Sequence, residues 1–367
     1  MLTAIIVLAV LLLAVMLVLK FYPALGGVLT KEQLAAFSRL PHYKDGKFKN
    51  LSATAMENSA SNLFSMLRDY MKTNPNRKPQ AQLPLQKLQF GGDDKGEQAR
   101  VTWFGHSAML LELDGKHILL DPMFGQAPTP FPFFGNKRYS GKLPFEIAEL
   151  PQIDAVVLSH DHYDHLDYDS ILKLKNKVRR FIVPLGVGSH LERWGVEKSI
   201  ITEHDWWEEL EFEGIRLAAA PAQHFSGRNL NNRDSTLWCS WVITGRAANI
   251  YFSGDSGYGA HFKEIGEKYG PFDLTLMECG QYDPRWASIH MMPEETVQAH
   301  VDVKGKTLLP IHWGAFTLSF HDWNDPVERV TQAAKQLNVQ VATPIIGEPV
   351  AVGAGRLPSS IWWKTAQ

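Results

Sequence analysis

Three imidazoles and a carboxylate that can bind metal ions lie within six residues near the middle of the chain. The segment runs SHDHYDHLD over residues 159–167. His160 and His162 alternate, so an extended backbone projects both side chains to the same side. After the turn, Asp164 and His165 can face a second point from the first turn of a helix. Two pairs of ligands directed at neighbouring points suit two metal ions a few ångströms apart.

The ligand types of this cluster indicate which metal it would bind. Imidazole and carboxylate without thiolate fit zinc, although manganese and iron accept the same ligand types. The two cysteines, Cys239 and Cys279, are too few for a thiolate zinc cluster or a disulfide framework, and their spacing leaves open whether they pair. A solvated polar loop is the alternative for the histidines, but it suits a lone histidine better than a packed cluster. We therefore expect two zinc ions per chain.

Three further residues of ligand type follow predicted strands, as a two-metal site requires. They are His224 in PAQH, Asp255 in FSGDSG and His312 in PIHWG. Gly254 lets the backbone approach closely just before Asp255. Taken alone, each of the three residues can equally be a cap or a core residue. Together with the cluster they complete a ligand set for two metals.

The elements that must position these residues change character at Arg100. Before it, residues 23–97 predict a connector that packs on the main domain, with short helices at 31–39 and 51–71. After it we expect strands at 101–104, 108–113, 117–120, 155–158, 210–212, 215–220, 237–244, 249–252, 274–277 and 307–311. We expect helices at 165–175, 261–268, 293–301 and 327–337. Hairpin strands interrupted by helices predict mixed sheets with helices packed outside, and function on the loops at strand ends.

The N-terminal segment 2–19 is wholly apolar or small, and a helix of roughly 20 such residues crosses a bilayer. A cleaved signal peptide is the alternative, but it would carry basic residues before the apolar run and small residues after it. Here nothing basic precedes the run, which ends in Lys20-Phe21-Tyr22-Pro23. We therefore expect an uncleaved single-pass membrane anchor over residues 1–22. Basic residues follow the run rather than precede it, which favours a cytoplasmic catalytic domain.

The order of the ligands resembles that of the metallo-β-lactamase superfamily: HxHxDH in the cluster, then His224, Asp255 and His312. Within that superfamily the sequence is similar to the N-acyl-phosphatidylethanolamine-hydrolysing phospholipase D branch. The stretches that carry this narrower similarity are 105–107, 120–124, 149–157, 159–168, 221–225, 237–241, 284–286 and 311–314. They span residues 101–320, whereas the metal motif alone marks only the superfamily.

The resemblance implies an α+β fold, a four-layer αββα sandwich over residues 98–367, and a hydrolase with two zinc ions. One zinc would bind His160, His162 and His224, the other Asp164, His165 and His312, with Asp255 bridging the two. Zinc lowers the pKa of bound water from about 15.7 to about 7, so a metal-bound hydroxide is available as the nucleophile at neutral pH. The implied reaction is hydrolysis of N-acyl-phosphatidylethanolamine to phosphatidic acid and N-acylethanolamine, with a membrane phospholipid and the lipid bilayer as partners.

Two residues outside the ligand set are expected to assist the reaction. The resemblance places His290 by the substrate phosphate, as a catalytic residue alongside Asp164 and Asp255. It can donate to a phosphoryl oxygen or protonate the leaving group; the alternative is a structural histidine at a helix start. Asp121 is a candidate outer acceptor for a ligand imidazole, although a turn aspartate fits its position equally well.

A proline-rich loop over residues 128–134 offers a contact with lipid. It places Phe131, Phe133 and Phe134 among prolines and just before basic residues, which suits a lipid headgroup boundary. The alternative is that the rings pack beneath a neighbouring sheet. Arg228 is assigned, with the three phenylalanines, to contact with the substrate or the membrane.

Composition excludes some functions and leaves others open. The net charge of −2 creates no global field toward nucleic acid, so no nucleic-acid partner is expected. A lactonase, β-lactamase or cyclic-phosphate hydrolase of the same fold would use the same zinc pair. A non-catalytic, membrane-tethered envelope protein is the alternative from another class, and retention of the whole ligand set disfavours it. The headgroup and acyl preference and the oligomeric state stay open, a homodimer included.

Overall fold

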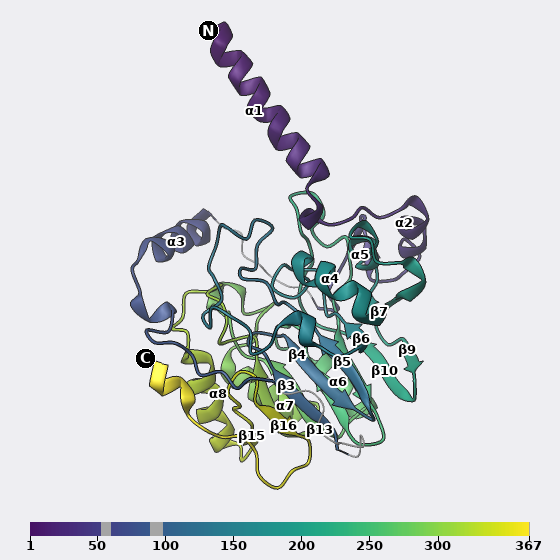
Figure 1. The fold of residues 1–367 in the computed structure, drawn as a ribbon, viewed down its shortest axis with the longest axis vertical. Coiled ribbons are helices and arrows are strands. Elements are labelled where there is room, and N and C mark those ends of the chain that lie inside the picture. The colour runs from purple at the N-terminus through teal and green to yellow at the C-terminus, as the bar shows by residue number, and fades with distance from the viewer. Residues whose placement is uncertain (53–59, 89–97, 367) are drawn as a thin grey trace.

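The computed structural model describes residues 1–52, 60–88 and 98–366 of the chain. Two seven-stranded sheets form its centre (Figure 1). The first has the order β16 (Pro349–Ala351), β3 (Arg100–Trp103), β4 (Met109–Leu113), β5 (Lys116–Leu120), β6 (Ile153–Val157), β7 (Val178–Pro184) and β8 (Ile201–His204). The second has the order β15 (Gln340–Val341), β14 (Gly305–Ile311), β13 (Phe272–Glu278), β12 (Asn249–Phe252), β11 (Ser240–Thr244), β10 (Ile215–Ala220) and β9 (Glu209–Phe212).

Both sheets are mixed, antiparallel at one side and parallel at the other. In the first sheet β16 to β5 pair antiparallel, and β5 to β8 pair parallel. In the second sheet β9 to β12 pair antiparallel, and β12 to β15 pair parallel. Parallel strands need a crossover connection, and here an α-helix supplies it for every parallel pair except β5 and β6, which a long loop joins.

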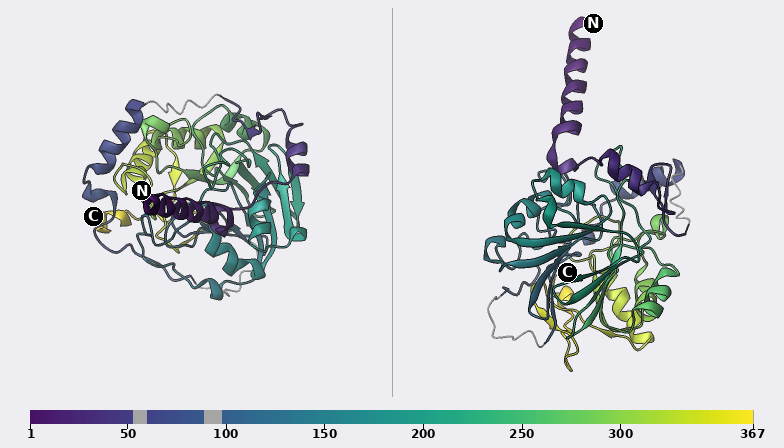
Figure 2. Two further views of the ribbon diagram at one scale, coloured as in Figure 1. Left: turned by 90° about the horizontal axis from the view of Figure 1, so that it is seen from above. Right: turned by 90° about the vertical axis from the view of Figure 1, so that its right-hand side faces the viewer.

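The two sheets face each other across one hydrophobic core, and helices cover their outer faces (Figure 2). Along β4, Met109 and Leu111 lie in the inter-sheet core, while Leu110 packs in a second cluster outside the sheet with Ile171 and Leu191. Successive strand residues point to opposite faces, so this alternation gives one layer on each side of the sheet. The result is the four-layer αββα sandwich that the sequence predicts.

The helices differ in what they cover. The outer face of the first sheet carries α4 (Tyr168–Leu174) and α5 (Gly188–Arg193), whereas α6 (His261–Lys268), α7 (Pro293–Asp302) and α8 (Asp325–Gln336) pack on the second sheet. Three helices precede the sheets: α1 (Leu2–Phe21), α2 (Lys31–Phe37) and α3 (Ala60–Met71). A short hairpin of β1 (Tyr43–Lys44) and β2 (Lys47–Phe48) follows α2.

Helix α1 projects away from the rest of the molecule (Figure 1). Its 20 residues are all exposed, and its mean hydropathy of 3.3 makes it long and apolar enough to cross a membrane. At 1.5 Å per residue the helix is about 30 Å long, the thickness of a bilayer's hydrocarbon core.

Several expected elements begin or end elsewhere than the sequence predicts. The helix expected at 165–175 starts only at Tyr168, because the Asp167 side chain accepts from the Ser170 N–H and caps it there. Asp164 and His165 therefore lie in the preceding turn rather than in a helical turn. The strand expected at 237–244 starts at Ser240, since the N–H groups of residues 237 and 239 donate to loops of the first sheet.

Other differences concern elements that the sequence analysis did not include, or included only in part. Strands β1, β2, β7, β8, β15 and β16 and helix α5 are additional. The helix expected at 31–39 ends at Phe37. Of the helix expected at 51–71, the part over 53–59 lies outside the described residues, and the remainder is α3. Cys239 and Cys279 are both buried and free, so they do not form a disulfide.

A tryptophan cluster closes the C-terminal end of the chain onto the sheets. Trp313 stacks on both Trp103 and Trp362, with ring centroids 5.3 Å apart in both pairs, and the ring centroids of Trp103 and Trp362 lie 6.5 Å apart. The Trp362 indole N–H donates to the Pro344 carbonyl at 3.0 Å, and its side chain is buried. Buried aromatic rings of this size contribute strongly to stability.

We expect Trp362→Ala to lower the free energy of unfolding by about 3–5 kcal/mol, because it removes a large buried side chain and leaves a cavity. The matched control is Ile361→Ala at the exposed neighbouring position, which should change it by less than about 0.5 kcal/mol. Urea unfolding followed by tryptophan fluorescence measures both. Equal losses in the two variants would contradict the packing described here.

Candidate metal centre

The ligand-type residues meet where strands of both sheets end. His160 follows β6, His224 follows β10, Asp255 follows β12 and His312 follows β14. Because the sheets face each other, loops from both come together at this edge, and every one of these four side chains is almost fully buried. The strands thus form a rigid frame that fixes the backbone from which each ligand projects.

The first ligand group consists of three imidazoles. His162 Nδ1 lies 2.9 Å from His160 Nε2 and 3.2 Å from His224 Nε2. Asp255 Oδ2 lies 3.8 Å from the same nitrogen of His160 and of His224. Three ring nitrogens and a carboxylate oxygen therefore converge on one point.

The second ligand group lies on the other side of Asp255. His165 Nε2 is 3.0 Å from Asp255 Oδ2 and 3.5 Å from Asp164 Oδ2. His312 Nε2 is 4.0 Å from Asp164 Oδ2, and its Nδ1 is 3.2 Å from Asp255 Oδ1. Asp255 is thus shared between the two groups, which is the position required of a bridging ligand.

Two buried atoms in this arrangement test whether metal ions fit it. His165 Nε2 and Asp255 Oδ1 are both buried. Each has a polar atom of the centre at 3.0–3.2 Å, but among the described residues neither makes a contact with hydrogen-bond geometry. Leaving buried polar atoms unpaired is costly, and a cation between them would satisfy both. The nitrogen and oxygen ligands also match those of zinc and other transition metals. The residues present therefore fit a pair of metal ions.

The ring nitrogens that face away from the centre have their own partners. His165 Nδ1 lies 2.6 Å from Asp121 Oδ2, His160 Nδ1 lies 2.9 Å from Ser159 Oγ, and His224 Nδ1 lies 3.0 Å from the Ile289 carbonyl oxygen. Such outer partners fix the orientation and tautomer of a metal-binding imidazole. Asp121 also accepts from the Ser159 N–H at 2.7 Å, so it holds the start of the ligand loop and one of its ligands.

Burial and local charge set the protonation of the ligands. Burial lowers the pKa of His160, His224 and His312 well below the usual range, so their rings are neutral at pH 7 and can donate a lone pair. Burial alone would raise the pKa of Asp255, but the nearby imidazoles of His165, His312 and His160 together outweigh it and hold that pKa well below its usual value. The centre therefore presents neutral imidazoles at these three histidines and an ionised carboxylate at Asp255. Although burial opposes the charged form, the carboxylates of Asp255, Asp164 and Asp121 raise the pKa of His165 well above its usual value.

His290 borders both ligand groups. Its ring centroid is 5.0 Å from that of His224 and 5.2 Å from that of His312. His290 Nδ1 lies 2.8 Å from Glu278 Oε2, which leaves Nε2 as its second ring nitrogen. Although burial opposes the charged form, the Glu278 carboxylate raises the pKa of His290.

Glu278, at the end of β13, is a site residue that the sequence analysis missed. Besides contacting His290, it accepts from the Ser256 N–H at 3.1 Å and the Met291 N–H at 3.0 Å. Burial raises the pKa of Glu278 to about 7. A carboxylate ending an otherwise apolar strand, LTLME, was the only available signal.

His106 is the second missed residue. Its Nε2 lies 2.8 Å from Asp164 Oδ2, its ring is fully buried, and its Nδ1 has no hydrogen-bond partner. The backbone adopts a left-handed φ of 57° at this position, while its N–H and carbonyl bond to the backbone of Trp313 and His312. The signal in the sequence was a histidine in FGHS directly after the strand over 101–104.

The expected lipid contacts fall into two classes. Phe133 and Phe134 are 75% and 67% exposed. Phe131 is half-buried and stacks on Tyr22, just after α1, at 4.9 Å between ring centroids. Two of the three rings are therefore free for contact with another molecule, and the third is partly occupied by the segment that leaves α1.

Arg228 does not lie where a substrate or membrane contact would require. Its side chain is only 3% exposed, and its guanidinium donates to the backbone carbonyls of Ala24, Asp161 and Leu166. The expectation was wrong because an arginine with a long apolar stem can be buried when carbonyl groups accept from all sides of its head. Arg228 holds chain segments together instead.

The chain is similar in sequence to members of the beta-lactamase superfamily and to other curated proteins, and similar in fold to a solved structure. The family model of the beta-lactamase superfamily domain matches residues 116–313. The chain is 41% identical to an uncharacterized protein of Mycobacterium tuberculosis over 348 residues, 93% of this chain and 92% of that protein. It is 36% identical to N-acyl-phosphatidylethanolamine-hydrolyzing phospholipase D 1 of Caenorhabditis elegans over 230 residues, 59% of this chain and 64% of that protein. A metallo hydrolase of Ignicoccus hospitalis has the same fold, with a TM-score of 0.53 at 21% identity over 70% of this chain and 99% of its own.

We expect Asp121→Asn to weaken metal binding about 10- to 100-fold, because His165 loses the carboxylate that orients its ring. The matched control is Asp273→Asn, near the start of β13 and therefore at the end of that strand away from the metal centre. It should leave metal affinity unchanged. Chelator competition with the purified protein measures both. Wild-type affinity in Asp121→Asn would show that this carboxylate does not support the centre.

Proposed function

The chain belongs to the metallo-β-lactamase superfamily as a metal-dependent hydrolase, and we propose that it hydrolyses N-acyl-phosphatidylethanolamine in a membrane to phosphatidic acid and N-acylethanolamine. The observation that carries the proposal is the 36% identity to the phospholipase D of C. elegans over 230 residues. The preference for this headgroup rests on that similarity, and the membrane location rests on α1.

The proposed reaction assigns roles to residues of this chain. A pair of metal ions, when bound, would supply Lewis acidity toward the phosphate and acidify a water molecule. Asp255 holds the two ligand groups in register. His290 Nδ1 contacts the Glu278 carboxylate, so Nε2 is the nitrogen left to face the substrate. From there His290 can donate a proton to a phosphoryl oxygen or to the leaving alkoxide.

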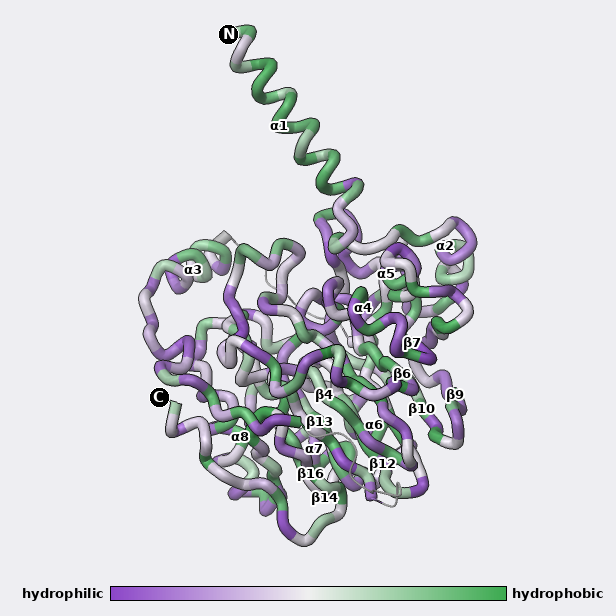
Figure 3. Tube along the Cα trace, viewed as in Figure 1, coloured by the Kyte–Doolittle hydropathy of each residue, from purple (hydrophilic) through white to green (hydrophobic). Residues whose placement is uncertain are grey.

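The membrane is proposed to lie at the end of the molecule from which α1 projects. The exposed Phe133 and Phe134 lie on the loop whose Phe131 stacks beneath that helix. Helix α3 presents further exposed apolar side chains at helical spacing, Leu63, Phe64, Leu67, Tyr70 and Met71. Figure 3 shows α1 as a hydrophobic helix and α3 as a helix with alternating hydrophobic and hydrophilic stretches, both in the upper half of the view. Basic residues from Lys20 onward favour the cytoplasmic side, which a reporter fused after Gln367 tests.

We expect His290→Gln to lower kcat about 10²- to 10⁴-fold on N-acyl-phosphatidylethanolamine in mixed micelles, because the variant loses its transferable proton. Its metal content should match the wild type. His117→Gln, a half-exposed histidine on β5, is the matched control and should retain activity. Phosphatidic acid release and elemental analysis measure the two quantities.

Three results of that experiment would contradict parts of the proposal. Loss of metal in His290→Gln would make this residue a ligand rather than a proton donor. Full activity in the variant would remove it from the reaction. A metal-loaded wild-type protein that releases no phosphatidic acid would exclude this substrate and direct attention to lactones, lactams and cyclic phosphates.

We expect Phe133→Ser with Phe134→Ser to lower activity on vesicles about tenfold or more, since burial of a phenylalanine contributes about 1.5–3 kcal/mol. Activity on a soluble phosphodiester should stay near that of the wild type. Ile361→Ser, an exposed apolar residue near the C-terminus, serves as the control for lost surface hydrophobicity. Equal loss on vesicles and on the soluble substrate would show that the rings support packing instead of membrane contact.

A further inference from the structure

A buried arginine connects the metal-ligand loop to the segment that leaves α1. Arg228 Nη1 donates to the carbonyls of Asp161 at 2.6 Å and Leu166 at 2.7 Å. Its Nε and Nη2 donate to the Ala24 carbonyl at 3.1 and 3.0 Å. The two sides of one guanidinium fork thus hold two segments that are far apart in the sequence.

In the sequence, the two carbonyls that Arg228 engages flank three of the four ligands of this loop, His162, Asp164 and His165. Asp161 follows His160, and Leu166 follows His165. Between them, the Tyr163 hydroxyl donates to the Arg228 carbonyl, and the Tyr163 ring lies 4.1 Å from the guanidinium carbon. The loop therefore closes around Arg228, and movement of this side chain would displace the backbone that bears the ligands.

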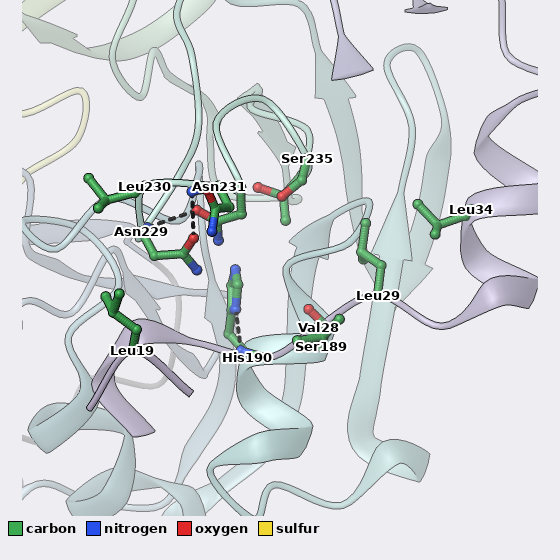
Figure 4. Close-up of a pocket in the computed structure, with 13 residues that line it drawn as sticks. Leu19, Val28, Leu29, Leu34, Ser189, His190, Asn229, Leu230, Asn231 and Ser235 are labelled. Atoms are coloured by element: carbon green, nitrogen blue, oxygen red, sulfur yellow. Dashed lines mark hydrogen bonds between the residues drawn. The ribbon is translucent and has the colours of Figure 1, made fainter. Parts of the chain in front are cut away.

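A second set of contacts joins the same two segments through His190. The Gly27 N–H donates to His190 Nδ1 at 2.8 Å, and His190 Nε2 lies 3.1 Å from Asp161 Oδ2. The other oxygen of Asp161 accepts from the Gly227 N–H at 2.7 Å. His190 lines a pocket of about 380 Å³. In Figure 4 its side chain lies between Val28, which directly follows the segment, and the loop that contains Asn229 and Ser235.

The segment Pro23–Gly27, which we call the juxtamembrane segment, fits against this region without space to spare. A Cβ atom on Gly26 would lie 2.3 Å from His190 Nδ1, and one on Gly27 would lie 1.9 Å from the Ser189 carbonyl oxygen. The Trp194 indole N–H donates to the Pro23 carbonyl at 2.7 Å. The juxtamembrane segment is therefore held in one position relative to the ligand loop.

We propose that Arg228 is a positioning residue that transmits the position of the juxtamembrane segment to the metal-ligand loop. The membrane helix and the metal centre are then mechanically connected, and a displaced juxtamembrane segment weakens metal binding. Residues that orient metal ligands typically change metal affinity 10- to 100-fold when they are altered. The inference rests on the metal centre of the proposed function and adds a connection to the membrane helix.

The test uses the full-length protein in lipid nanodiscs with Gly27→Ala and Arg228→Lys. The first variant forces the juxtamembrane segment off Ser189 and His190, and touches no ligand. The second keeps the charge but replaces the fork by a single ammonium, which can serve only one of the two segments at a time. Gly355→Ala is the matched control, because a Cβ there meets no atom within 4 Å.

Zinc affinity, measured by chelator competition, should fall at least tenfold in Gly27→Ala and in Arg228→Lys and stay at the wild-type value in Gly355→Ala. In the double variant, zinc affinity should fall by less than the product of the two single fold-losses, because both substitutions disrupt the same connection. Hydrogen exchange of the metal-free variants gives a second readout. Amides of the ligand loop, residues 160–166, should exchange faster, while those of β13 should stay protected.

The outcomes separate this inference from the proposed function. Wild-type zinc affinity and unchanged loop exchange in both variants would overturn the connection and leave the hydrolase intact. Uniformly faster exchange that includes β13 would assign the effect to general unfolding and also overturn it. A wild-type protein that binds no zinc would overturn the metal centre and the inference together.

Discussion

The shared position of Asp255 between two groups of buried imidazoles is the constraint on which the rest of the structure depends. Its Oδ2 lies 3.0 Å from His165 Nε2 and 3.8 Å from Nε2 of His160 and of His224. An ionised carboxylate at this depth is tolerated only with close partners, so the three loops that supply them must be positioned to within about 0.5 Å. Two facing sheets provide that accuracy because loops on rigid strand ends have little freedom.

The supporting contacts extend well beyond the sandwich. Asn50, which follows the N-terminal hairpin, bonds through its side chain to both the N–H and the carbonyl of His224 and accepts from the Trp238 indole. Arg228 and His190 bring the juxtamembrane segment against the loop that carries the other ligands. Residues before β3 are thus part of the structure that holds the candidate metal centre, and the segment that follows α1 is in contact with it.

Much of the site could be predicted because metal ligands are local features at strand ends. The cluster over 159–167 and the isolated His224, Asp255 and His312 all follow apolar strands, and the structure brings them together. His106 and Glu278 were missed because a single histidine or glutamate after a strand has many ordinary explanations. Arg228 was misassigned because nothing in a sequence distinguishes an arginine that faces lipid from one whose head is enclosed by backbone carbonyls; that depends on contacts between distant segments.

Metal content of the purified full-length protein tests the central claim most directly, when the wild type is compared with Asp255→Ala by elemental analysis. The account predicts two metal ions per wild-type chain and fewer in a variant whose near-ultraviolet circular dichroism still shows a folded protein. Removal of the shared carboxylate should affect both positions, because each relies on it. A wild-type chain without stoichiometric metal, or an Asp255→Ala variant that retains both ions, would contradict the assignment of this cluster as a two-metal centre.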